Sequence, residues 1–186
     1  MPAGIQVMTA SLALDHVPHL RKESKGYEIE RRFLVANDAW RTHATGMHAL
    51  SDGIVRFGMG KVRVRIDETR AWVTFKGPRD GARRLELEYP IPAEEAVRIL
   101  LALQPDLLIE KIRYQVPFGR HLWSVDVHSR PFGGLITAEV ELADQRDHVE
   151  IPSWAGREIT QSFEAEVLHW LRTGESRGGA GIAAAR

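Results

Sequence analysis

Hydrophobic and polar residues alternate with a period of two along much of the chain, which is the pattern of strands that are buried on one face. The pattern predicts long strands over residues 27–35, 61–66, 70–76, 83–89, 108–116, 122–128 and 135–142, and short strands over 54–57 and near 158–160. The spacing of apolar residues predicts helices over 39–50, 93–103 and 163–171, the first capped by Asn37 or Asp38. Asp52-Gly53 is expected to form a turn. The chain shows no internal repeat and no second core, so we expect one α+β domain.

Charged residues collect on one face of these strands, and apolar residues occupy the other. On the first strand Glu28, Glu30 and Arg32 share a face, whereas Phe33 and Val35 share the opposite one. Across all strands the charged faces carry seven acids and seven bases: Glu28, Glu30, Arg32, Arg63, Arg65, Lys76, Arg84, Glu86, Glu88, Lys111, Arg113, Asp126, Glu139 and Glu141. For any single strand, a solvated sheet face with cross-strand ion pairs is the simpler interpretation.

Same-sign doublets such as Glu139 and Glu141, or Arg63 and Arg65, argue against a merely solvated face. Neighbouring like charges repel, so these doublets suit a face on which acids hold divalent cations and bases hold a polyanion. Enough antiparallel strands can close into a barrel and so remove their edges. The pattern therefore favours a closed barrel with a polar, charged lumen and helices packed against its apolar outside. A triphosphate together with Mg²⁺ or Mn²⁺ would suit both halves of the lumen.

Composition excludes some classes of function but does not identify one. The chain has 186 residues, and its 25 basic and 25 acidic residues cancel, so no overall field favours nucleic acid or a membrane surface. It contains no cysteine, which fits a reducing cytoplasm and leaves carboxylates and histidines as the possible metal ligands. The eight histidines have no metal-ligand spacing as a group. His128 lies two residues past Asp126 and could face the lumen, but we expect it at a tunnel mouth or in solvent. Residues 1–25 are expected to form an N-terminal extension and residues 174–186 a loose tail, which leaves 26–173 as the domain.

The order of these motifs resembles the CYTH domain of the triphosphate tunnel metalloenzymes. The opening segment 28–34 is similar to the Glu-x-Glu-x-Lys signature of that family. Further similarities in type and spacing lie at Arg63–Arg65, Thr74–Lys76, Arg84–Tyr89, Lys111–Tyr114, Trp123–Asp126, Gly134–Leu135 and Glu139–Glu141. The resemblance implies an antiparallel eight-stranded tunnel and chemistry on a triphosphate that depends on Mg²⁺ or Mn²⁺.

The resemblance also implies an activity and roles for residues. Water would attack the terminal phosphorus of a small-molecule triphosphate, most simply inorganic tripolyphosphate, and release orthophosphate and a diphosphate. Phosphate-binding roles fall to Arg32, Arg63, Arg65, Lys76, Arg84, Lys111 and Arg113. Metal-binding roles fall first to Glu28, Glu30, Glu139 and Glu141, and then to Asp126 and Glu88. Glu28 or Glu30 would orient the water, and Arg32 completes the catalytic set.

Other functions are compatible with the same motifs. The family includes thiamine triphosphatases and class IV adenylate cyclases, and a non-catalytic module that binds polyphosphate or a nucleotide would need the same charged lumen. A barrel with a purely structural role would bind neither metal nor triphosphate. The apolar outer faces of the strands could also support a homodimer.

Two positions depart from the family pattern. Arg32 stands where the family signature has Lys, and a guanidinium forks between two oxygens where an ammonium is a point charge. After Thr160 many relatives carry an acid followed by Arg-Tyr and Asn, whereas this chain continues with Gln161, Ser162, Phe163 and Glu164. That part of relatives often helps to close the tunnel, so both departures bear on substrate preference.

Overall fold

The computed structural model describes residues 26–68 and 70–174 of the chain. The expected extension at 1–25 and the tail after Gly174 lie outside the described residues. The elements in chain order are β1 (Tyr27–Val35), the 3-10 helix η2 (Asp38–His43), β2 (Gly46–Phe57), β3 (Gly60–Asp67), β4 (Arg70–Asp80), β5 (Arg83–Ile91), α1 (Ala93–Leu103), β6 (Leu107–Phe118), β7 (His121–Arg130), β8 (Ile136–Glu141), β9 (Ala155–Glu158) and α2 (Phe163–Thr173).

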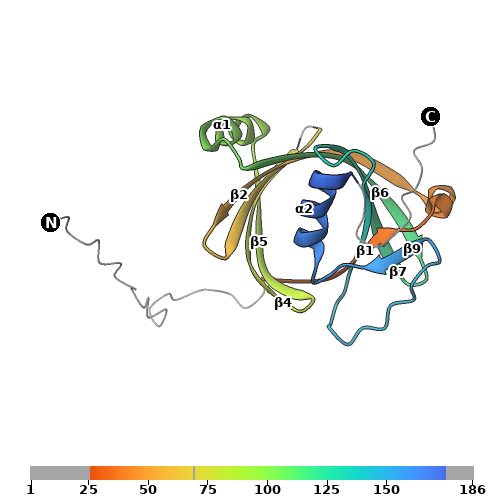
Figure 1. The fold of residues 1–186 in the computed structure, drawn as a ribbon. Coiled ribbons are helices and arrows are strands. Elements are labelled where there is room, and N and C mark those ends of the chain that lie inside the picture. The colour runs from red at the N-terminus through yellow and green to blue at the C-terminus, as the bar shows by residue number, and fades with distance from the viewer. Residues whose placement is uncertain (1–25, 69, 175–186) are drawn as a thin grey trace, which may run out of the picture.

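Strands β1 to β8 close into an antiparallel barrel, which is seen end-on in Figure 1. Neighbouring strands follow the order β5-β4-β3-β2-β6-β7-β8-β1, and β1 pairs again with β5 to complete the ring. One edge of β1 pairs with β8, while its other edge is shared between β5, at residues 27–29, and the short strand β9, at residues 33–35. The structure confirms the α+β class and the closed eight-stranded barrel.

The hydrophobic core lies outside the barrel wall. The larger cluster covers the outer face of β1, β6, β7 and β8, and is built around Trp123, which contacts Phe33 and Trp154 at ring-centroid distances of 5.4 and 5.3 Å. A smaller cluster joins Val64 of β3 to Ala96 of α1. Burial of these aromatic and aliphatic side chains is what stabilises a barrel that has charges inside.

The predicted helix over residues 39–50 is wrong beyond His43. Asn37 caps a helix as expected, and its side chain accepts a hydrogen bond from the Ala39 amide at 3.0 Å. The segment then leaves the helix and becomes the 12-residue strand β2, which pairs with β3 along one edge and β6 along the other. Hydrogen bonding on both edges outweighs local helix propensity. The expected turn at Asp52-Gly53 lies inside this strand.

At Gly53 the side chain of Leu100 on α1 comes close to the backbone of β2. A Cβ atom at this position would collide with the side chain of Leu100. The glycine that signals a turn in the sequence therefore marks the place where a helix approaches the barrel wall.

The helices do not all cover the outside of the barrel as expected. Helix α1 lies against β3 and β4 on the outer face, but α2 crosses the barrel opening in the view of Figure 1. The outer face of β4 and β5 keeps Phe75, Leu85 and Tyr89 exposed. A homodimer through such a face stays a prediction. Among residues 26–68 and 70–174, no helix is long and apolar enough to cross a membrane.

We expect Trp123→Ala to lower the free energy of unfolding by about 3–5 kcal/mol, because it removes a fully buried ring from the larger cluster. Leu122→Ala is the matched control, since the side chain of the neighbouring Leu122 is 56% exposed and its loss should cost less than about 0.5 kcal/mol. Urea unfolding followed by circular dichroism measures both. Equal losses for the two variants would contradict the outer location of the core.

Candidate active site

The barrel encloses a cavity of about 180 Å³ that is lined mainly by ionisable side chains, and we call this cavity the tunnel. Its lining includes eight bases, Arg32, Lys61, Arg63, Arg65, Lys76, Arg84, Lys111 and Arg113. It also includes seven acids, Glu28, Asp52, Glu86, Glu88, Asp126, Glu139 and Glu141. Side chains two residues apart on each strand point to the same face, so the alternation in sequence places all of them inside. The near balance of charge suits a polyanion that arrives together with a divalent cation.

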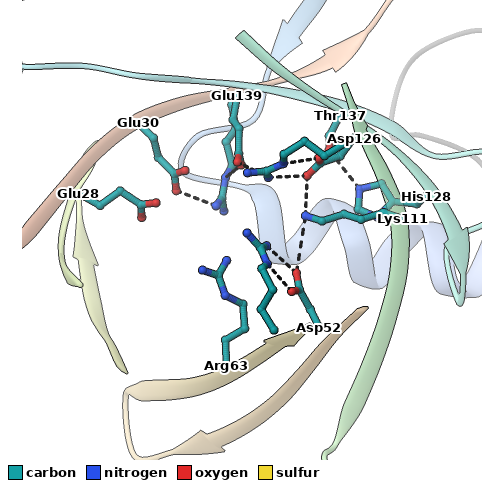
Figure 2. Close-up of polar contacts among 12 residues, drawn as sticks. Glu28, Glu30, Asp52, Arg63, Lys111, Asp126, His128, Thr137 and Glu139 are labelled. Carbon is teal, nitrogen blue, oxygen red and sulfur yellow. Dashed lines mark hydrogen bonds and ion pairs between the residues drawn. The ribbon is translucent and has the colours of Figure 1, made fainter. Parts of the chain in front are cut away.

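Arg32 and Arg113 connect three acids on the β1, β7 and β8 side of the tunnel. Figure 2 shows these acids, Glu30, Asp126 and Glu139. Arg32 contacts Glu30 at 2.7 Å and Glu139 at 3.4 Å. Arg113 donates to both oxygens of Asp126, at 2.7 and 2.8 Å, and also contacts Glu139. Each buried acid is thus matched by a guanidinium, which is the condition for keeping charges inside a protein.

The chain of ion pairs continues through Asp52 on β2. Lys111 donates to Asp126 at 2.5 Å and lies 3.7 Å from Asp52. Arg65 donates to both oxygens of Asp52, at 2.6 and 2.8 Å. Asp52 on β2 therefore forms ion pairs with both neighbouring strands, through Arg65 of β3 and Lys111 of β6. Both of these bases are predicted phosphate-binding residues.

The β1 and β5 side of the tunnel is arranged in the same way. Arg84 contacts Glu28 at 2.6 Å and Glu30 at 3.4 Å. Lys76 lies 3.9 Å from Glu28 and forms a close ion pair with Glu86. These contacts continue the alternation of acid and base around the tunnel wall.

Arg63 is the last base in this series of ion pairs, and it lies near one mouth of the tunnel. Its guanidinium contacts Glu88 at 2.9 Å and Glu86 at 3.7 Å, and it also donates to the hydroxyl of Thr74 at 3.2 Å. Glu88 is half-exposed here, so its side chain lies at the tunnel mouth and away from the buried centre.

Asp52 and Lys61 also line the tunnel, and neither belongs to the set of site residues that the sequence predicts. Asp52 was missed because Asp-Gly was interpreted as a turn. Asp52 reaches the charged face because it lies inside β2, directly opposite Arg65 in the register with β3, and this pairing is not visible in the local sequence.

The expectation for His128 is wrong. Its ring is buried in the tunnel wall, where Nε2 lies 3.1 Å from the hydroxyl of Thr137. Burial and the charge of Lys111 lower the pKa of His128 to about 4, so the ring is neutral at physiological pH. His128 is therefore a neutral hydrogen-bonding partner of Thr137 in the tunnel wall.

The acids of the tunnel differ in how firmly they are held as carboxylates. Burial opposes ionisation of Glu139, but Arg113 and Arg32 outweigh it and lower its pKa to about 2. Asp126 is buried as well, and Arg113 and Lys111 hold its pKa well below the usual range. Both of these acids serve as counter-ions that fix the positions of the surrounding bases.

Glu141 has a different environment. It lies opposite Glu30 in the β1–β8 register, and within the described residues no cation is found at ion-pair distance from it. Partial burial of its carboxyl group raises the pKa of Glu141 although the residue as a whole is exposed, and the charges of Glu139 and Glu28 raise it further. A carboxylate crowded by other carboxylates gains from a bound cation, and carboxylate oxygens are the donors that a hard divalent ion prefers, so Glu141 is the acid in this part of the tunnel that is most open to such an ion. In the described part of the chain, however, no three acidic or histidine side chains converge on one point.

The tunnel also carries buried donors that make no hydrogen bond. The buried Nε of Arg63 has no hydrogen-bond partner within residues 26–68 and 70–174, whereas the buried Nε of Arg32 makes no hydrogen bond there but lies 3.4 Å from a carboxylate oxygen of Glu139. A buried donor left unpaired costs free energy. Both arginines line the tunnel, and an oxyanion there would satisfy the Nε of Arg63.

The closed β-barrel with paired charges throughout its interior is a tunnel-type barrel with a charged lumen. The CYTH domain family matches residues 26–168, and the chain belongs to this family. Family membership implies a divalent metal ion as cofactor.

Individual relatives agree with this assignment. The inorganic triphosphatase of Acetivibrio thermocellus is 40% identical over 136 residues, which cover 73% of this chain and 86% of that protein. The crystal structure of the inorganic triphosphatase NE1496 is similar with a TM-score of 0.51 at 25% identity, and covers 74% of this chain and 92% of that one. The PH1012 protein of Pyrococcus horikoshii OT3, at 15% identity, shares the fold with a TM-score of 0.52 over 86% of this chain and 99% of that one.

Lys76 should make anion binding depend on pH. Burial and the charge of Arg63 lower its pKa to about 7, against the opposing effect of Glu28 and Glu86. Below pH 7 the ammonium is charged and attracts phosphate, and above pH 7 that charge is lost. Between pH 6 and 8 we expect the affinity of metal-free protein for tripolyphosphate to fall by roughly tenfold relative to Lys76→Arg, which stays charged.

Isothermal titration calorimetry at several pH values measures this difference. Ionisation of the ligand affects both proteins equally and cancels in their ratio. Parallel pH curves for the wild type and Lys76→Arg would contradict the lowered pKa.

Proposed function

We propose that this protein is a metal-dependent inorganic triphosphatase, which hydrolyses tripolyphosphate to diphosphate and orthophosphate. The observation that carries the proposal is the tunnel lining of eight bases and seven acids around about 180 Å³. A tripolyphosphate with a divalent cation presents both signs of charge in a small volume, so it can exchange partners with both sets of side chains. Family membership and the relatives that are inorganic triphosphatases support the same activity.

The bases would hold the phosphates. Arg63, Arg65, Lys76, Arg84, Lys111, Arg113 and Arg32 are the candidates. Their forked or pointed donors match phosphate oxygens and would neutralise the charge that develops on the leaving diphosphate. The Nε of Arg63, which has no hydrogen-bond partner in the described part of the chain, is a donor that a bound oxyanion could satisfy.

The acids crowded at the β1–β8 junction would hold the metal. Glu28, Glu30, Glu139 and Glu141 are the first candidates for Mg²⁺ or Mn²⁺, with Asp126 and Glu88 after them. When bound, such an ion would supply charge neutralisation and lower the pKa of a water molecule. Asp126 and Glu139 are less available than the others, because Arg113 and Lys111 occupy both oxygens of Asp126 and Arg113 and Arg32 occupy both oxygens of Glu139.

The remaining step is to position the attacking water. Glu28 or Glu30 would orient it toward the terminal phosphorus and accept its proton. Glu30 is fully buried, and three guanidinium groups, those of Arg32, Arg79 and Arg84, already contact its Oε1. Glu28 is the more accessible of the two and is therefore our first choice. Arg32 would stabilise the phosphate next to these acids.

Glu30→Gln and Glu141→Gln should each lower the rate of phosphate release from tripolyphosphate by about a hundredfold, because each removes a metal-binding charge. Malachite-green detection of phosphate with Mg²⁺ or Mn²⁺ measures the rates. Glu94→Gln, an exposed acid at the start of α1, is the control and should match the wild type. We expect Glu141→Gln to recover part of its rate at high metal concentration. Unchanged turnover in both tunnel variants would rule out the metal assignment.

Arg32→Lys restores the family signature but should lower kcat/KM for tripolyphosphate by about tenfold. An ammonium cannot contact Glu30 and Glu139 together and also stack on an aromatic ring as this guanidinium does. Steady-state kinetics on the two proteins measures the effect. A marked gain in activity would mean that Arg32 represents a loss of catalytic function in this chain.

A nucleotide cyclase would use the same tunnel, and its products distinguish it from a triphosphatase. Incubation with ATP and metal should release orthophosphate and no cyclic AMP if the proposal holds. Accumulation of cyclic AMP would replace the triphosphatase with a nucleotide cyclase.

A further inference from the structure

We propose that Thr137 is a further triphosphate-binding residue, whose hydroxyl donates a hydrogen bond to a phosphate oxygen, and that His128 is the positioning residue that holds this hydroxyl in place. The inference rests on the proposed triphosphatase function and adds two uncharged residues to its site. Neither belongs to the phosphate-binding set above, which consists of arginines and lysines. We call the two side chains the Thr137–His128 pair.

Thr137 lies on the tunnel side of β8. It precedes Glu139 by two residues, so the two side chains share one face of the strand, and both line the tunnel. Thr137 is paired with Asp126 of β7 in the strand register, and its side chain is buried. In Figure 2 it stands beside Asp126, and a dashed line joins it to the ring of His128. The hydroxyl is therefore inside the charged lumen and out of bulk water.

The hydroxyl of Thr137 differs from those of the other buried threonines. In the described part of the chain the buried threonines are Thr74, Thr137 and Thr160, and the first and last each donate to a glutamate, at 2.8 and 2.6 Å. The hydroxyl of Thr137 has His128 as its one hydrogen-bond partner in that part, with Nε2 at 3.1 Å. A hydroxyl has a single hydrogen to donate. The proton on the histidine ring therefore decides whether this hydrogen is available to a ligand.

The environment of His128 favours a ring that donates to Thr137. A neutral imidazole carries one N–H, either on Nδ1 or on Nε2. Nδ1 is buried and has no hydrogen-bond partner among residues 26–68 and 70–174, so a proton there would be a buried donor without an acceptor. A proton on Nε2 is instead donated to the Thr137 hydroxyl, and the hydroxyl hydrogen is left to point into the tunnel. An anion in the tunnel selects this second arrangement, because the first turns only the lone pairs of the hydroxyl toward it.

The ring of His128 is fixed before any ligand binds. It packs edge-on against Phe132, at a ring-centroid distance of 5.9 Å and an interplanar angle of 86°. Phe132 is itself buried, and the backbone amide of His128 donates to the carbonyl of Leu135 at 3.0 Å. Binding a phosphate therefore does not have to order the Thr137–His128 pair.

The pair also differs from the bases of the tunnel in what is given up on binding. Each of the eight bases that line the tunnel has an ion-pair partner. A phosphate that binds one of these bases competes with a carboxylate for it. The hydroxyl of Thr137 has no carboxylate to lose, so its hydrogen bond to a charged oxygen adds directly to affinity.

Isothermal titration calorimetry of the metal-free protein with tripolyphosphate tests the hydroxyl. We expect Thr137→Val, which replaces the hydroxyl with a methyl group, to weaken binding about tenfold, and Thr137→Ser to stay within about twofold of the wild type. Thr42→Val makes the same change at an exposed position of η2, and as the control it should leave the affinity unchanged. An affinity of Thr137→Val equal to that of the wild type would overturn the role of the hydroxyl.

Two variants of His128 test the positioning role. His128→Phe removes both ring nitrogens but keeps an aromatic ring against Phe132, and we expect it to weaken binding about fivefold. His128→Gln, whose amide can donate from the position of Nε2, should recover most of that loss. In the Thr137→Val background His128→Phe should have no further effect, because His128 reaches the ligand only through the hydroxyl. The same loss in both backgrounds would indicate a merely structural role and overturn the proposal.

Nitrogen NMR of protein labelled at its histidine rings determines where the proton lies. The signals of His128 are those that disappear in His128→Phe. With tripolyphosphate bound we expect Nε2 to carry a proton, and an unprotonated Nε2 would contradict the positioning role.

None of these measurements requires turnover, so the inference and the proposed function fail separately. A wild type that binds tripolyphosphate through Thr137 but releases no phosphate with Mg²⁺ or Mn²⁺ would defeat the proposed function and uphold the Thr137–His128 pair as a binding element. A wild type that does not bind tripolyphosphate would overturn both.

Discussion

The structure depends on the pairing of opposite charges inside a closed barrel. Removing a carboxylate or a guanidinium from water costs several kcal/mol, and the cost is offset only where a partner is close. Here the partners alternate around the wall, for example from Asp52 through Lys111 to Asp126. When a metal ion and a triphosphate bind, the acids would pair with the metal and the bases with the phosphates, so that no charged side chain would lose its partner. The ligand therefore replaces an interaction that already exists, which lowers the cost of preparing the site.

A charged interior requires the apolar core to lie elsewhere. The clusters around Trp123 and under α1 lie on the outer face of the barrel, so stability and ligand binding use opposite faces of the same strands. An outer substitution such as Trp123→Ala should act on folding, whereas an inner one such as Glu141→Gln should act mainly on binding and turnover. This division follows directly from the period of two.

The same period explains which features were accessible from sequence. The barrel class, most strands and the charged face could be predicted, because strand alternation is local. The length of β2 could not, because its hydrogen bonds to β3 and β6 come from distant segments and Gly53 imitates a turn. Nor could the position of α2, since periodicity identifies the apolar side of a helix but not the surface that receives it. The contact between Arg32 and Phe163 joins residues 131 positions apart and appears only in three dimensions.

One edge of β1 changes partner partway along, from β5 at residues 27–29 to β9 at residues 33–35. The ring is therefore closed by three residue pairs, and one of them joins Glu28 to Arg84. The seam of the barrel and the candidate catalytic strand are the same piece of chain. An open sheet would separate the acids of β1 from the bases of β5, so chemical competence in this protein is inseparable from the topology of a closed ring.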